Sequence, residues 1–179
     1  MIVLALCGSV REPSSTRLAM NTALEAAQAA GAEVRWPSQA LSTLPFCDGR
    51  RGDYGEAVTT FRAEVASANA ILIGSPEYHG AFSGVLKNAL DLLEEDALRN
   101  KLVAVVATAK GDAGAMNTLN HLRHVVRWMN AWVLPAQVSI PRASERAASG
   151  EFDAELTKEL AVLGQELVRY GRLLANPSA

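Results

Sequence analysis

Residues 2–17 read IVLALCGSVREPSSTR, and this stretch indicates the fold class. Residues 2–7 are an unbroken apolar run closed by Gly8, which is typical of a strand buried on both faces in a parallel sheet. Beyond Thr16 the period changes, because apolar residues recur at the spacing of one helix face until Gly31. The stretch therefore predicts a buried strand, a polar loop and a helix.

The same alternation continues along the chain. Four further strands are predicted, at residues 33–36, 70–74, 101–108 and 132–140, with helical patterns between them and at 156–174. We expect the third strand to stop at Ser75-Pro76 and the fifth to be interrupted at Pro135. Alternating strands and helices imply a parallel sheet with right-handed crossovers. With no repeat or linker, residues 1–179 predict one doubly wound α/β domain, with five parallel strands and helices on both faces.

Composition restricts the function classes. A net charge of −2 gives no electrostatic footprint for nucleic acid or an anionic membrane. The apolar start is too short for a signal peptide, so we expect a cytoplasmic protein. Cys7 and Cys47 lie at neither a redox-motif nor a metal-ligand spacing, and we expect reduced thiols. His121 and His124 share a helix face but lack a third ligand, so no metal site is predicted.

The loop after the first strand concentrates hydroxyl groups and one arginine at the start of a helix. Free backbone N–H groups and the helix dipole attract anions at such a position. The polar residues are Ser9, Arg11, Ser14, Ser15 and Thr16. Taken alone, the loop supports equally a phosphate site and an ordinary turn in which Ser15 or Thr16 caps the helix. Its glycine pattern matches neither a dinucleotide-binding loop nor a P-loop.

The loop after the third strand reads SPEYHGAFSGVLKNALD over residues 75–91. Its backbone groups could meet a planar polar ring, with Tyr78 or Phe82 shaping the edge. A hydrolase built on Ser83, His79 and Asp91 is disfavoured, because GAFSG is not the GxSxG elbow. Ser83 fits better as a helix N-cap. A metal at His79 would have no nearby partner ligand.

Together the two loops resemble the NADPH-dependent FMN reductase family, flavodoxin-like enzymes that include azobenzene, quinone and chromate reductases. The first loop is similar to the family signature GSxRxxS, through Gly8, Ser9, Arg11 and Ser14. The second is similar to PEYxxxxxGxLKNALD, through Pro76, Glu77, Tyr78, Gly84, Leu86, Lys87, Asn88, Ala89, Leu90 and Asp91. Many members have Asn at the positions of Thr16 and His79. The glycine-rich loop after the fourth strand is diluted here by Asp112 and Ala113.

The resemblance implies a flavodoxin-like fold, bound FMN, NAD(P)H as cosubstrate and assembly as a homodimer or homotetramer. It implies that the FMN phosphate is held by Ser9, Arg11, Ser14, Ser15 and Thr16. It implies that the flavin ring is lined, mostly through backbone groups, by Pro76, Glu77, Tyr78 and His79. The loop at Gly111 would touch the far side of the ring.

Hydride transfer from a nicotinamide to a flavin needs no protein acid or base, so we name no certain catalytic residue. Tyr78 and His79 are candidates for tuning or proton supply. We expect ping-pong kinetics, with free flavin, a quinone, an azo compound or a metal oxyanion as the small-molecule oxidant.

Two questions stay open from sequence. Arginines that could meet the 2′-phosphate of NADPH are Arg11, Arg17, Arg50 and Arg51, although a solvated loop explains Arg50-Arg51 equally well. An electron carrier without NAD(P)H activity, or a flavin-binding module, is the alternative on the same fold.

Overall fold

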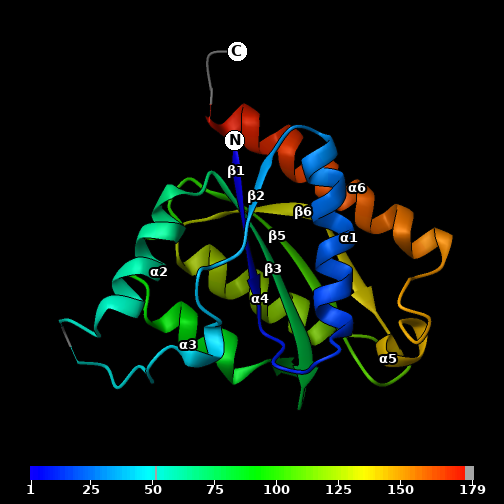
Figure 1. Cartoon of the computed structure of the whole chain (residues 1–179), viewed down its shortest axis with the longest axis horizontal. Helices are drawn as coiled ribbons and strands as arrows, with labels where there is room; N and C mark the ends of the chain where they lie inside the picture. The colour runs from blue at the N-terminus through cyan, green and yellow to red at the C-terminus, as the bar shows by residue number, and fades with distance from the viewer. Residues whose placement is uncertain (51, 176–179) are drawn as a thin grey trace.

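The computed structural model describes residues 1–50 and 52–175, and it contains the predicted five-stranded parallel sheet (Figure 1). The strands stand in the order β2-β1-β3-β5-β6, and each neighbouring pair is parallel. They are β1 (Ile2–Cys7), β2 (Glu33–Arg35), β3 (Ala70–Tyr78), β5 (Leu102–Thr108) and β6 (Trp132–Ile140). This order is the flavodoxin-like one, with the switch point between β1 and β3.

Helices cover both faces of the sheet (Figure 1). One face carries α1 (Ser15–Ala29), α5 (Ala143–Arg146) and α6 (Ala154–Ala175). The other carries α2 (Glu56–Ser67), α3 (Gly84–Asp91), α4 (Met116–Trp128) and the 3-10 turn η1 (Leu41–Thr43). Successive residues of a strand point to opposite faces, so Val3 joins one core and Leu4 the other. This two-sided burial is why the strands are continuous apolar runs.

Strand β3 is longer than the sequence predicts. It does not stop at Ser75-Pro76 but continues to Tyr78, with Pro76 in register with Thr108 of β5. The strand β1 ends opposite Gly74, so from Ser75 onward β3 has a parallel neighbour on one side only. At such an edge a missing proline N–H is tolerated. The extension carries the loop residues of the motif into the sheet.

The other departures are local. The two-residue strand β4 (Ala81–Phe82) pairs antiparallel with the end of β3 and was not predicted. The predicted interruption at Pro135 is a bulge within β6, where the register shifts opposite Val103 and Val105. Among the described residues, no helix is both long enough and apolar enough to cross a bilayer.

Helices α1 and α6 pack at close range because Gly164 has no side chain. A Cβ atom at this position would overlap the carbonyl group of Ala23 on α1. The atoms that the Cβ would meet belong to the backbone of α1, so they cannot move aside without shifting the helix.

We predict that Gly164→Ala lowers the free energy of unfolding by about 1–3 kcal/mol, the usual cost of overpacking. Helix propensity alone would act in the opposite direction, because alanine is favoured over glycine by roughly 0.5–1 kcal/mol. Urea denaturation measures the sign. The exposed neighbour Gln165, changed to alanine, is the control and should lose no stability. A more stable Gly164→Ala protein would contradict the packing argument.

Candidate functional site

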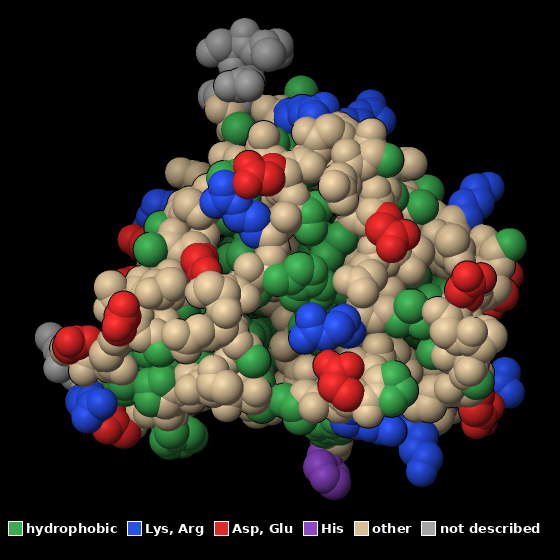
Figure 2. Space-filling model, in the orientation of Figure 1, with side chains coloured by type: hydrophobic (Ala, Val, Ile, Leu, Met, Phe, Trp, Pro, Cys, Tyr) green, Lys and Arg blue, Asp and Glu red, His purple; other side chains and the backbone are tan. Residues whose placement is uncertain are grey.

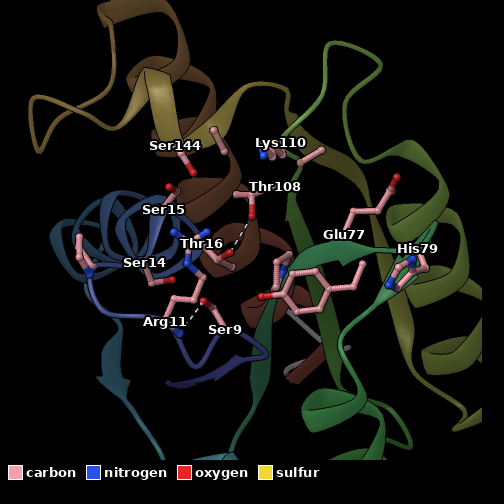
Figure 3. A pocket seen from close by; sticks show the side chains of 15 residues that line it. Ser9, Arg11, Ser14, Ser15, Thr16, Glu77, His79, Thr108, Lys110 and Ser144 are labelled. Atoms are coloured by element: carbon pink, nitrogen blue, oxygen red, sulfur yellow. Dashed lines mark hydrogen bonds between the residues drawn. The ribbon is translucent and has the colours of Figure 1, made fainter.

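A cavity of about 300 Å³ opens where β1, β3 and β5 end (Figure 3). Carboxyl ends of strands at a topological switch point are where such folds bind ligands. The lining includes Ser9, Arg11, Pro13, Ser14, Ser15, Thr16, Pro76, Glu77, Tyr78, His79, Thr108, Ala109, Lys110, Ala143 and Ser144. The structure thus brings together the two loops that the sequence singled out.

The N-terminus of α1 forms one wall of the cavity. Ser14 is its N-cap: its backbone is extended and its hydroxyl accepts a hydrogen bond from the Arg17 N–H at 3.1 Å. The expectation that Ser15 or Thr16 caps this helix is therefore wrong. The first helical bond runs from the Leu18 N–H to the Ser14 carbonyl at 3.0 Å. The N–H groups of Ser15 and Thr16 precede it and have no helical acceptor, so they can donate to an anion.

A buried hydroxyl pair forms the floor. Thr16 Oγ1 and Thr108 Oγ1 are 2.7 Å apart, and the two residues are 2% and 5% exposed. One hydroxyl donates to the other, which leaves one hydroxyl proton available. The pair therefore joins α1 to the end of β5 and still offers a hydrogen bond to a ligand.

Two cations lie at the cavity. Figure 3 shows Arg11 beside Ser14 and Thr16, with Lys110 and Ser144 on the opposite side. Glu77 is the single acidic residue of the lining that the structure describes. The local charge is therefore positive, as a phosphate requires.

The carboxylate of Glu77 has a structural partner outside the hydroxyl-rich loop. Its Oε2 accepts a hydrogen bond from the Thr118 N–H in the first turn of α4, at 3.1 Å. The N-cap position of that helix is Ala115, which has no capping side chain. Glu77 supplies the missing acceptor, and its charge suits the helix N-terminus. The sequence analysis did not foresee this contact.

Tyr78 and His79 lie on the tight hairpin that joins β3 to β4. Tyr78 pairs with Ala81, so His79 and Gly80 form the two-residue loop, with φ angles of +52° and +78°. Such loops require left-handed backbone, which Gly, Asn, Asp and His adopt more readily than other residues. The hairpin presents the side chains of Tyr78 and His79 to solvent at the edge of the cavity. Figure 2 shows a histidine side chain projecting from the lower edge of the molecule, where β3 ends in Figure 1.

The remaining predicted residues lie apart from this lining. Gly111 is exposed, and its carbonyl accepts from the Arg142 N–H at 3.2 Å. Arg17 lines a neighbouring cavity of about 190 Å³, with its guanidinium 4.7 Å from the Trp36 ring centroid. Arg50 pairs with Asp48 at 3.7 Å and lines neither cavity, and Arg51 lies outside the described residues.

Three polar lining residues escaped sequence reasoning: Thr108, Lys110 and Ser144. Thr108 ends the fourth predicted strand and Lys110 follows it. That strand lies beside the third, and its carboxyl end was the available signal. Ser144 lies on α5, a four-residue helix too short to show a periodic pattern. The N-cap role predicted for Ser83 is confirmed, because its hydroxyl accepts from the Leu86 N–H at 3.2 Å.

Fold and site define a flavodoxin-like α/β protein with a pocket suited to a phosphate group. Residues 1–145 match the NADPH-dependent FMN reductase family, and the chain belongs to this family. It is 32% identical to the NADPH-dependent FMN reductase ArsH of Shigella flexneri, over 96% of this chain and 69% of that protein.

Two further comparisons agree with this membership. The NADPH azoreductase of Bacillus sp. (strain OY1-2) is 36% identical over 55% of this chain and 56% of its own. The chain thus spans only about half the length of that relative. The structure of FerB, a flavoenzyme NAD(P)H:(acceptor) oxidoreductase from Paracoccus denitrificans, superposes with a TM-score of 0.80 at 22% identity. That match covers 96% of this chain and 97% of FerB, and it shows the shared fold.

We predict that His79→Asn retains the stability of the protein, whereas His79→Val loses about 1–3 kcal/mol. The reason is the positive φ at this position, which β-branched residues adopt only under strain. Urea denaturation of the two variants measures the difference. Equal stabilities would show that the hairpin does not hold residue 79 in this conformation.

Proposed function

We propose that this protein is an NAD(P)H-dependent oxidoreductase that holds FMN in the cavity at the ends of β1, β3 and β5. The observation that carries the proposal is the convergence of a helix N-terminus, several hydroxyl groups and two cations on one small pocket. Family membership supports the redox chemistry, because the relatives named above are FMN reductases and azoreductases. The acceptors we propose are free flavin, quinones and azo compounds.

The residues present fit the phosphate of FMN. We propose that the N–H groups of Ser15 and Thr16 and the hydroxyls of Ser9, Ser14 and Ser15 donate to its oxygens. Arg11 neutralises its charge, and Lys110 adds a second cation from the opposite side. Charge-assisted hydrogen bonds of this kind are about twice as strong as neutral ones.

The flavin ring would lie toward the hairpin, beside Pro76, Glu77, Tyr78 and His79. Bound FMN supplies the chemistry, by accepting a hydride from the nicotinamide and passing electrons onward. The protein contributes orientation, and Tyr78 and His79 are candidates for proton supply. Tyr78 is 45% exposed, so this side of the cavity is open to a second molecule. NAD(P)H and the oxidant would use it in turn, which predicts ping-pong kinetics.

Several finer points remain proposals. Because Arg11 is assigned to the FMN phosphate, the arginine that we propose for the 2′-phosphate of NADPH is Arg17, which lines the neighbouring cavity. Assembly as a homodimer or homotetramer, which the family resemblance implies, is also a proposal. A cytoplasmic location and a role for Gly111 at the outer edge of the ring stay predictions.

We predict that Arg11→Ala raises the dissociation constant for FMN by about tenfold to a hundredfold. A hydrogen bond to a charged group contributes about 1.5–3 kcal/mol, and 1.4 kcal/mol corresponds to a factor of ten. Titration of the apoprotein with FMN, followed by flavin fluorescence, measures the constant. The control is Arg35→Ala, because Arg35 lies on β2 and is paired with Glu33. Undiminished affinity in Arg11→Ala would place the phosphate elsewhere.

We predict that the FMN-loaded protein loses its flavin absorbance when NADPH or NADH is added without oxygen, and that adding a quinone restores it. The rates with the two nucleotides, recorded by stopped-flow spectroscopy, give the nucleotide preference. A protein that binds FMN but is not bleached by either nucleotide would be an electron carrier. A protein that takes up no FMN would favour a binding or regulatory module on the same fold, and either result would refute the proposed activity.

A further inference from the structure

A second and larger cavity, of about 770 Å³, lies at the opposite end of the strands, where β6 begins. It is lined by Arg99, Asn100, Arg123, His124, Arg127, Asn130, Ala131, Trp132 and Val133. The cavity described above lies where the parallel strands end. Strand β5 has seven residues, and at roughly 3.3 Å per residue its two ends are about 20 Å apart. The second cavity is thus separate from the proposed flavin site.

The cavity carries uncompensated positive charge. Arg123 and Arg127 stand one turn apart on α4, and Arg99 faces them from the loop before β5. Arg123 donates from Nη1 to the carbonyl of Leu134 at 2.7 Å, a neutral partner that orients the guanidinium without cancelling its charge. Of the three arginines, Arg99 is paired, with Asp96 at 2.6 Å. Asp96, which also accepts from Asn130 Nδ2 at 2.7 Å, neutralises Arg99. The positive charge that favours an anion therefore belongs to Arg123 and Arg127, for which the described lining supplies no carboxylate.

An indole lies beside these charges. Trp132 is the first residue of β6, lines the cavity and is 58% exposed. Trp128, the last residue of α4, precedes Trp132 by four positions and is 70% exposed. An exposed indole next to guanidinium groups offers a stacking surface and phosphate ligands together. We propose that this cavity binds a nucleoside polyphosphate, with the phosphates on Arg123 and Arg127 and the base on Trp132.

Two other occupants fit the cavity less well. A second copy of the chain, docked through this surface about a two-fold axis, would bring the arginines of both copies together. Like charges at that range repel, so this face disfavours self-association. A small inorganic anion would satisfy the arginines but would leave the Trp132 indole exposed.

The test is titration of the FMN-saturated protein with ADP, followed by tryptophan fluorescence and calorimetry. We expect saturable quenching, and Trp132→Ala should abolish most of the signal while Trp36 and Trp128 remain. Arg123→Gln and Arg127→Gln should each weaken ADP binding about tenfold or more, because each removes a charge-assisted contact. Arg169→Gln is the matched control, since Arg169 is an exposed arginine on α6, outside this cavity.

Three results would overturn the proposal. The first is no saturable binding of ADP up to millimolar concentration. The second is equal affinity in Arg127→Gln and Arg169→Gln, which would place ADP elsewhere on the protein. The third is equal affinity for pyrophosphate and ADP, which would remove the role of the indole. FMN retention, measured by flavin absorbance on the same samples, distinguishes failure here from failure of the flavin proposal.

Discussion

The buried hydrogen bond between Thr16 and Thr108 is the contact on which the site geometry depends. It fixes the first turn of α1 against the end of β5. The free N–H groups of the helix therefore lie at the cavity beyond the carboxyl ends of the strands. Helix α1 can approach β3 this closely because Gly74 has no side chain, and a Cβ there would collide with Met20 on α1. A side chain at Gly8 would similarly meet Ser83 at the start of α3. At both places a side chain would displace neighbouring side chains, and neither glycine has a positive φ.

Much of the fold could be predicted from the sequence, because strands buried on both faces must be apolar at every position. The run at residues 70–74 was unmistakable for this reason. Its continuation to Tyr78 was not, because Pro76 and Glu77 normally end strands. What extends the strand is tertiary: Pro76 lies opposite Thr108, and the chain then turns back at His79-Gly80 to pair Phe82 with Glu77. Neither partner can be read from the local pattern.

The candidate site divides in the same way. Hydroxyls crowded before a helix fit an anion pocket and an ordinary capped turn equally well, so the first loop indicated the candidate residues, and the family resemblance favoured the phosphate. Lys110 and Ser144 carry no such signature, since each is one polar residue in an ordinary segment and reaches the cavity only through the fold. Glu77 shows the opposite case. Its motif was visible, but its carboxylate contact with the Thr118 N–H depends on where α4 begins.

Helix α4 lines the second cavity and contacts the first through Glu77, which lines that cavity. A carboxylate from Glu77 meets its N-terminus, and Arg127 stands in its last turn, so each end carries the charge that the dipole favours. The favourable interaction with the helix dipole is a structural explanation for Arg127 at this position. It gives none for Arg99, which comes from another segment, and little for Arg123, which lies a turn before the helix end. Asp96 accounts for Arg99 and the dipole for Arg127. The charge of Arg123 beside Trp132, together with that of Arg127, for which the described lining supplies no carboxylate, is therefore what points to a ligand.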